Sequence, residues 1–372
     1  MYMGYGRRSV GKYKRRYLWR IAIILSAVVL VIGAVPMVAT MVLFRRNFGA
    51  RAENIEARAE FLRIPFSVRY EDVTGYPRRQ THFYSGGNRL AAFIYGEEND
   101  KGLIVISHGF TLGAEYYFNE TMYFVDNGWR VFAFDNTGSH NSEGRSVRGL
   151  PQSVLDLDAA LTYIATQGWG LPVMLYGHSW GGFAACVVLA KGHDIASVVS
   201  LAGFATAMGV MHEVARDGIG LGLGAYIAYP YLWLHQRLMF GRYAGLSAVD
   251  GINSGTAPVK IIHGTQDRLI GYGGSSIIAQ RGRVTNPNAI FVSRSEPHHN
   301  GHLNLLRCAE AAAFIEHEFN PAFQELYDRH SGDIPCEILA AFHAEYDRRR
   351  RASALDMDFM DAINSFFKSH LR

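Results

Sequence analysis

Ser179 is the residue of this chain whose surroundings point most directly to chemistry. It stands between Gly177 and Gly181 in "LYGHSWGGFAAC", where an apolar run ends and a helix-like run of small and apolar residues begins. A serine on a sharp strand-to-helix turn needs neighbours without bulk, and glycine meets that need. The N-terminus of the following helix favours negative charge beside the hydroxyl. The pattern predicts that Ser179 is a nucleophile.

A serine hydroxyl is a weak nucleophile until a base removes its proton, and the segment "SRSEPHHNGHLNLL" contains three histidines. His302 stands on a Gly-His step that leads into a helix, so we favour it as the base. His299 is the alternative, and His298 is interpreted as a surface residue. A carboxylate must hold the tautomer of the base. Asp267, just after the apolar segment "VKIIHG", is favoured as that acid, and Asp250, which precedes the segment, is the alternative.

Acyl transfer also needs two backbone donors for the oxyanion of the tetrahedral intermediate. The N–H of Trp180, directly after the nucleophile, is one candidate, and the N–H of Phe110 in "SHGF" is the other. His108 in the same segment is interpreted as shaping the loop. No Cys/His spacing resembles a zinc site, and we expect no metal and no cofactor. The three cysteines, which form no disulfide framework, are Cys186, Cys308 and Cys336.

The elements that must position these residues are short apolar runs alternating with helix-like segments. This alternation predicts an α/β fold with a mostly parallel sheet covered by helices on both faces. Residues 67–76 and 81–96, with a Gly-Gly turn at 86–87, predict an antiparallel hairpin before it. The alternation breaks at 205–257, which predicts a helical cap above Ser179, with Tyr231 and Trp233 against the substrate.

Five segments carry a resemblance to a known family: "SHGF", "FDNTGSHNSEG", "GHSWGG", "HGTQD" and "GHLNLL". Together they resemble the α/β-hydrolases, and among these the serine hydrolases of the monoacylglycerol lipase and lysophospholipase type. The resemblance covers about residues 67–319 and implies a triad in the order Ser179, Asp267, His302. In the second segment, His140 stands where the family usually has a glycine.

The N-terminal part of the chain differs from the rest in charge and hydropathy. The first 51 residues hold ten Lys or Arg and no acid, so the remaining residues of this +4 chain carry a net charge of −6. The basic charge therefore belongs to the N-terminus, and we expect no nucleic-acid partner. Residues 21–44 contain no charged side chain, and a helix of this length, about 36 Å, is long enough to cross a bilayer.

These properties predict a basic tail over residues 1–20, a transmembrane signal anchor over 21–44, a stalk over 45–66 and a hydrolase domain over 67–372. A cleaved signal peptide is the alternative, but the apolar run is longer than the central region of such peptides. Seven Lys or Arg precede the apolar run and four follow it closely. This bias predicts a cytoplasmic N-terminus and a catalytic domain outside the cytoplasm.

The sequence therefore predicts a membrane-anchored serine hydrolase that cleaves carboxylic esters, of lipids or of other acyl compounds, through an acyl-enzyme on Ser179. Peptidase, amidase and thioesterase activity need the same residues, and the fold does not choose among these substrates. They remain alternatives. A catalytically silent α/β-hydrolase that serves as a binding module is a further alternative of a different class.

We expect Ser179→Ala to abolish covalent labelling of the protein by a fluorophosphonate, because no other serine of the chain stands in such a glycine turn. Loss of one hydroxyl should change the free energy of unfolding by less than about 2 kcal/mol. Labelling of folded protein on a gel, with denaturant unfolding as the control, checks both statements. Retained labelling at the wild-type rate would contradict the assignment.

Overall fold

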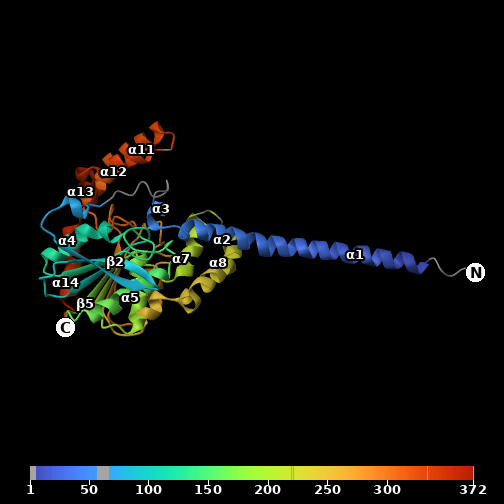
Figure 1. Ribbon diagram of the computed structural model, residues 1–372, viewed down its shortest axis with the longest axis horizontal. Coiled ribbons are helices and arrows are strands. Elements are labelled where there is room, and N and C mark those ends of the chain that lie inside the picture. The colour runs from blue at the N-terminus through green and yellow to red at the C-terminus, as the bar shows by residue number, and fades with distance from the viewer. Residues whose placement is uncertain (1–5, 57–66, 219, 221, 333, 372) are drawn as a thin grey trace, which may run out of the picture.

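The computed structural model describes residues 6–56, 67–218, 220, 222–332 and 334–371, and these contain one eight-stranded sheet (Figure 1). The spatial order of its strands is β1-β2-β4-β3-β5-β6-β7-β8. Pairing is parallel from β4 to β8 and antiparallel for β1–β2 and β2–β4. The strands are β1 (Arg78–Ser85), β2 (Asn88–Tyr95), β3 (Leu103–Ser107), β4 (Arg130–Phe134), β5 (Val173–His178), β6 (Ser197–Leu201), β7 (Val259–Gly264) and β8 (Ala289–Arg294).

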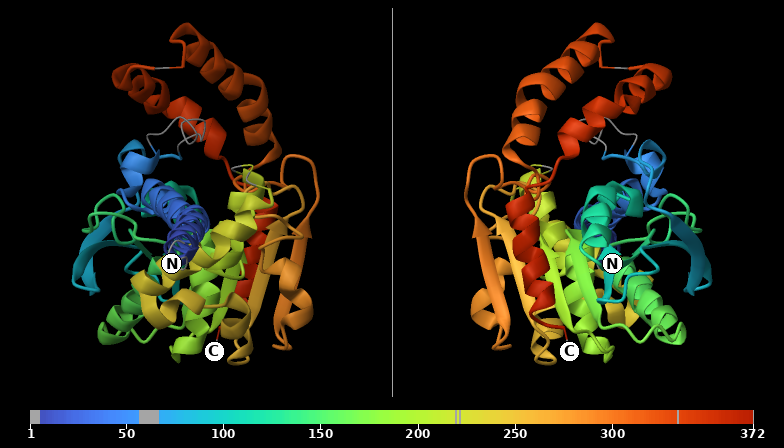
Figure 2. Two further views of the ribbon diagram at one scale, coloured as in Figure 1. Left: turned by 90° about the vertical axis from the view of Figure 1, so that its right-hand side faces the viewer. Right: turned by 90° about the vertical axis from the view of Figure 1, so that its left-hand side faces the viewer.

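Helices cover both faces of this sheet, as Figure 2 shows from two sides. One face packs against α5 (Gln152–Thr166), α6 (Trp180–Val187) and α9 (Ala248–Asn253), and the other packs against α4 (Phe118–Asp126) and α14 (Met357–Lys368). Every residue of the central strand β3 is buried, because apolar side chains meet a helix layer on either side. The predicted α/β architecture with a mostly parallel sheet is confirmed.

The predicted hairpin exists, but it is shorter than expected. Strands β1 and β2 flank Gly86 and Gly87, whose positive φ angles of 55° and 86° suit a tight turn. The segment predicted as the first strand, 67–76, instead contains the 3₁₀ turn η2 (Tyr70–Asp72). Here Asp72 accepts a hydrogen bond from the backbone N–H of Arg69, and this local bond favours a turn over an extended strand.

The segment between β6 and β7 forms the predicted helical cap with one difference in extent. The cap consists of α7 (Ala207–Glu213), the π-helical turn η5 (Val214–Gly218), α8 (Gly224–Phe240) and the 3₁₀ turn η6 (Gly241–Gly245). Helix α9 lies within the predicted range but packs against α6 in the layer below. A Cβ on its Gly251 would stand 2.1 Å from the carbonyl oxygen of Cys186, so the two backbones touch.

The N-terminal residues form α1 (Gly6–Val29), the π-helical turn η1 (Leu30–Ala34) and α2 (Val35–Phe48), followed by α3 (Ala52–Glu56). Figure 1 shows α1 projecting from the body of the protein and α2 lying beside α8. The sequence predicts a helix over 21–44 that Pro36 can kink. In the structure a π-helical turn interrupts the helix, because Pro36, in the first turn of α2, has no N–H to donate to the preceding turn, which widens. Among the described residues, none of the individual helices is both long enough and apolar enough to cross a bilayer.

The predicted stalk also differs from what the structure shows. Phe48 and Ala52 are buried in the same core as α5 and α6, together with Phe44 from the end of the predicted anchor. The first part of the segment 45–66 is thus packed on the domain, because its aromatic side chains have an apolar surface to cover. Residues 57–66 of the predicted stalk lie outside the described residues.

Residues 309–353 leave the body of the protein as a group of helices that we call the C-terminal arm (Figure 2). It contains α10 (Ala309–Phe314), the π-helical turn η8 (Ile315–Phe319), α11 (Asn320–Arg329), α12 (Cys336–Ala344) and α13 (Tyr346–Ser353). The two ends of the arm lie side by side. The N–H of Cys308 donates to the carbonyl of Ala354 at 3.0 Å, and the N–H of Asp356 donates to that of Leu306 at 2.8 Å.

Candidate active site

Ser179 occupies the turn from β5 to α6 with φ 55° and ψ −111°, a backbone conformation that residues other than glycine rarely adopt. Holding one residue there costs on the order of 1–3 kcal/mol. The backbone N–H of Ser179 donates to the carbonyl of Leu201 at 2.7 Å, and this hydrogen bond holds the turn against the neighbouring strand β6. The hydroxyl is thereby presented at the N-terminus of α6.

The glycines around the serine are explained by how closely α6 approaches the sheet. A Cβ on Gly181 would lie 1.8 Å from the carbonyl oxygen of Ser107 on β3, and a Cβ on Gly177 would lie 2.3 Å from the carbonyl oxygen of Gly181. Neither position has room for any side chain. These contacts give the physical reason for the glycine pattern around Ser179.

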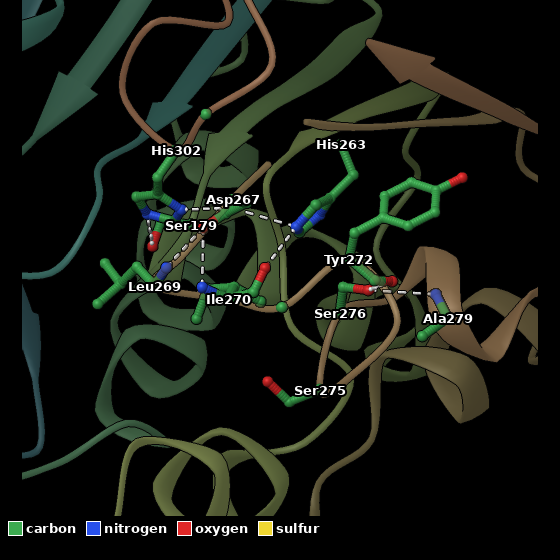
Figure 3. Close-up of polar contacts among 12 residues, drawn as sticks. Ser179, His263, Asp267, Leu269, Ile270, Tyr272, Ser275, Ser276, Ala279 and His302 are labelled. Carbon is green, nitrogen blue, oxygen red and sulfur yellow. Dashed lines mark hydrogen bonds and ion pairs between the residues drawn. The ribbon is translucent and has the colours of Figure 1, made fainter. Parts of the chain in front are cut away.

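The structure brings Ser179, His302 and Asp267 together in one line (Figure 3). The Nε2 atom of His302 lies 2.9 Å from Oγ of Ser179, and its Nδ1 lies 2.7 Å from Oδ2 of Asp267. An ionised carboxylate only accepts hydrogen bonds, so Nδ1 carries the hydrogen and Nε2 accepts from the serine hydroxyl. This is the geometry in which an imidazole takes the proton of an attacking serine.

Asp267 is held by more groups than the sequence predicts. Its Oδ1 accepts hydrogen bonds from the backbone N–H groups of Leu269 and Ile270, both at 2.9 Å. Nε2 of the fully buried His263 lies 3.1 Å from Oδ2. Burial acts to raise the pKa of Asp267, but the hydrogen bonds from His263 and His302 outweigh it and hold that pKa well below its usual range. The carboxylate is therefore ionised at neutral pH.

His263 is a residue of the site that the sequence reasoning missed. It begins the segment "HGTQD", four residues before Asp267, and that spacing was the available signal. Its Nε2 also lies 2.9 Å from the carbonyl oxygen of Ile270, so one N–H faces both oxygens.

The alternative base and acid lie elsewhere. The nearest acidic atom to His299 is a carboxylate oxygen of Asp356 at 3.9 Å, and half-exposed His298 lies 3.4 Å from Glu316. Asp250 is exposed on α9, on the layer that covers the sheet. Of these candidate residues, His302 and Asp267 are the two that are hydrogen-bonded to each other, and His302 is the one that is hydrogen-bonded to Ser179.

The two predicted oxyanion donors flank the nucleophile. Trp180 is the first residue of α6, so its N–H has no acceptor within that helix. Phe110 follows the end of β3, and its ring packs edge-on against the ring of Trp180 with 5.5 Å between centroids. Both residues line the same cavity as Ser179. No group of His, Cys, Asp and Glu in the described part of the chain has the arrangement of a metal site.

A second hydrogen-bonded chain links the loop after β3 to the base. The hydroxyl of Tyr117 accepts from the N–H of Gly109 at 3.0 Å and lies 2.7 Å from Nδ1 of His178. Nε2 of His178 lies 3.0 Å from the carbonyl oxygen of His302. Burial lowers the pKa of His178 to about 3, so this ring is neutral and donates from one nitrogen only. His178 thus links the loop after β3 to the loop that carries His302, a role that the sequence did not predict.

Two further histidines shape the loops beside the site. His108 is fully buried, and its Nε2 accepts from the backbone N–H of Asn136 at 2.9 Å. Burial lowers the pKa of His108 to about 4, consistent with its predicted role in shaping the loop. His140 has φ 40°, so its position does call for the glycine that the family usually has there. Its ring is held by the carbonyl of Thr111 at 3.1 Å.

Ser179 opens into an apolar cavity of about 250 Å³. The cap contributes Met211, Val214 and Leu232, and none of the described residues that line the cavity is acidic. The predicted cap contact through Tyr231 and Trp233 is wrong. The face of α8 that meets the cavity carries Leu232, and Trp233 is 47% exposed on another face.

Comparison with known proteins finds the following similarities. The model of the family described as "Serine aminopeptidase, S33" matches residues 98–226, which include Phe110, Ser179 and Trp180. Monoacylglycerol lipase of Mycolicibacterium smegmatis is 27% identical over 238 residues, which are 55% of this chain and 84% of the lipase. Alpha/beta hydrolase domain-containing protein 17B of Xenopus tropicalis is 27% identical over 196 residues, 50% of this chain and 58% of that protein. A solved esterase of Pyrococcus furiosus has a TM-score of 0.48 at 17% identity, with 68% of this chain and 93% of the esterase covered.

We expect Asp267→Asn to lower kcat for ester hydrolysis by about 10⁴-fold, because an amide does not stabilise the imidazolium or hold the correct tautomer. Steady-state kinetics of the folded variant check this value. Asp250→Asn is the matched control and should leave kcat unchanged. The reverse result, a loss in Asp250→Asn only, would show that the carboxylate beside His302 is not the acid.

Proposed function

We propose that the chain is a serine hydrolase of the α/β-hydrolase type and that it cleaves esters with an apolar acyl chain through an acyl-enzyme on Ser179. One observation supports this most strongly. The serine, the imidazole and the carboxylate stand at 2.9 and 2.7 Å from one another, and the serine opens into an apolar cavity.

In the proposed reaction, Oγ of Ser179 attacks the ester carbonyl carbon while Nε2 of His302 takes the hydroxyl proton. Asp267 stabilises the imidazolium, and the N–H groups of Phe110 and Trp180 receive the oxyanion. The tetrahedral intermediate collapses, the alcohol leaves with the proton from Nε2, and the acyl group stays on Oγ. A water molecule, deprotonated by the same imidazole, then releases the acid and restores the serine.

The lining of the cavity supports an acyl chain as the occupant. Apolar side chains from the loop after β3, from the cap and from α2 surround the space in front of Ser179. Burial of a methylene from water is worth about 0.8 kcal/mol, so such a lining favours longer chains. The Mycolicibacterium smegmatis relative is named a monoacylglycerol lipase, which agrees with a lipid ester as substrate.

The aminopeptidase that the family description suggests is the second candidate, and the cavity disfavours it. A peptide N-terminus is a cation and needs a carboxylate or a set of carbonyl oxygens in the substrate site. No Asp or Glu stands among the described residues around the cavity. Thioesterase activity has the same acyl requirement as esterase activity, and p-nitrophenyl esters, acyl thioesters and aminoacyl anilides offered in parallel separate the three.

We expect kcat/KM for p-nitrophenyl esters to rise from acetyl to longer acyl chains, by up to about fourfold per buried methylene. Leu232→Ala should flatten this rise, because it removes a cavity wall. The neighbouring Trp233→Ala, on the exposed face of α8, should not. Labelling by a fluorophosphonate confirms that each variant is folded. A preference for acetyl or aminoacyl substrates would contradict the lipid-ester proposal.

We also propose that the N-terminal helices contact a bilayer, with the catalytic domain outside the cytoplasm. Large apolar side chains along α1, η1 and α2 face outward, among them Ile24, Val31 and Val38 at 61%, 61% and 53% exposure. Basic residues stand before and after them in the sequence. Exposed apolar surface of this extent favours burial in a lipid phase.

We expect the full chain to stay in the membrane fraction after an alkaline carbonate wash. Val31→Glu combined with Val38→Glu should release it, since a charge in the hydrocarbon region is costly, about 2.5 kcal/mol or more. Protease added outside intact cells tests the orientation. Recovery of the uncleaved wild-type chain in the supernatant would contradict membrane association.

A further inference from the structure

The cavity in front of Ser179 has a wall that lies outside the segment matched by the family model. Helix α2 contributes Leu43, Phe44, Asn47 and Phe48 to its lining, at least fifty residues before that segment begins. We propose that α2 forms part of the acyl-chain subsite and sets the length of chain that the enzyme accepts. This inference rests on the proposed function, since it assigns a further part of the same site.

The C-terminal end of α2 and the residues after it are clamped to the domain, so the wall has a fixed position. The N–H of Ala52 donates to the carbonyl of Gly138 at 2.9 Å, and the N–H of Val147 donates to that of Ala50 at 3.0 Å. The guanidinium of Arg51 donates to three carbonyl oxygens of the same loop, those of His140, Ser142 and Gly144, at 2.7 to 3.1 Å. These bonds fix the chain directly after α2, and so they hold in place the end of the helix that lines the cavity.

Aromatic packing connects this wall to the reacting centre. The rings of Phe44 and Phe48 are buried and lie 4.8 Å apart between centroids. The ring of Phe48 then packs edge-on against Phe110 at 5.5 Å. Since Phe110 is the proposed oxyanion donor after β3, a chain extending from the acyl carbon meets the side chains of α2 on one side.

The cap supplies the opposite side of the same space. Met211, Val214 and Leu232 come from α7, η5 and α8, and α8 packs beside α2 (Figure 1). An acyl chain between the two would therefore lose water on both sides. Only those side chains of α2 that face the cavity can contact an acyl chain. Leu43 lines the cavity, whereas its neighbour Val42 is 56% exposed on the outer face.

The test compares two alkyl fluorophosphonates, one with an ethyl and one with a dodecyl chain, on the full-length protein. Each phosphonylates Ser179: an Oγ–P bond forms, the P–F bond breaks, and the serine proton is lost, so the rate of inactivation needs only the reactive serine and room for the chain. We expect the wild-type chain to react faster with the dodecyl probe. Each buried methylene should contribute up to about fourfold.

Leu43→Trp places bulk in the cavity, and we expect it to slow the dodecyl probe on the order of tenfold or more while the ethyl probe keeps its rate within about twofold. Val42→Trp is the matched control, with the same new side chain on the outer face, and should leave both rates unchanged. Should Leu43→Trp not fold, Leu43→Ala against Val42→Ala decides. The former should slow the dodecyl probe about fourfold for each methylene that loses its contact.

Equal effects of the substitution at position 43 and the matched one at position 42 would overturn the subsite, as would equal wild-type rates with the two probes. These outcomes leave the triad intact, because the ethyl probe still labels Ser179. Failure of both probes to label the wild-type chain would instead contradict the proposed function, and the subsite with it.

Discussion

The contact between α6 and the end of β3 is the constraint on which the rest of the site depends. Gly181 sits directly on the carbonyl of Ser107, and no side chain fits between them. This approach allows Ser179 to hold its positive φ angle while its N–H bonds to β6. The strain of one such residue, on the order of 1–3 kcal/mol, is small beside the burial of three adjacent apolar strands. The core of the sheet therefore holds the nucleophile in place.

The other reacting groups follow from the same sheet. In parallel strands the carboxyl ends lie along one edge, so Phe110 after β3, Asp267 after β7 and His302 after β8 reach the serine from neighbouring positions. On the side away from the cavity, polar groups are hydrogen-bonded to one another. His263 lies beside Asp267, and His178 links the loop after β3 to the loop that carries His302. In front, the surface is apolar. The site thus separates its fixed charges from the space for substrate.

The catalytic residues could be predicted from the sequence because the signals that mark them are local. Ser179, Asp267 and His302 each stand in a short motif next to an apolar strand, and strand order along the chain is enough to bring them together. The Gly-His step favoured His302 over His299, and the geometry shows that His302 is the histidine of this loop that contacts both Ser179 and Asp267. The sequence did not indicate which face of α8 meets the cavity, because Leu232 and Trp233 are adjacent and both apolar.

The N-terminal segment shows a different limit of sequence reasoning. An uncharged apolar run is the same whether its side chains meet lipid or a protein surface, so the sequence did not indicate that Phe44 at its end packs on the domain. The charged segment after it did not indicate that Phe48 does so either. Likewise, β-type residues at 67–76 did not reveal that Asp72 would close a turn. In both cases the outcome depends on partners distant in the sequence or on a competing local hydrogen bond.

The C-terminal arm leaves and rejoins the domain at one point, and this bears on how freely its length can vary. Because Leu306 and Asp356 are bonded to each other, the chain between them is an excursion whose two ends share a root. The entropy of closing such a loop grows only with the logarithm of its length. A change in its length therefore costs little entropy, whereas its exchange for another segment would remove the ion pair between Arg349 and Asp72. The arm is therefore a part of the chain whose length the positions of the catalytic residues constrain little.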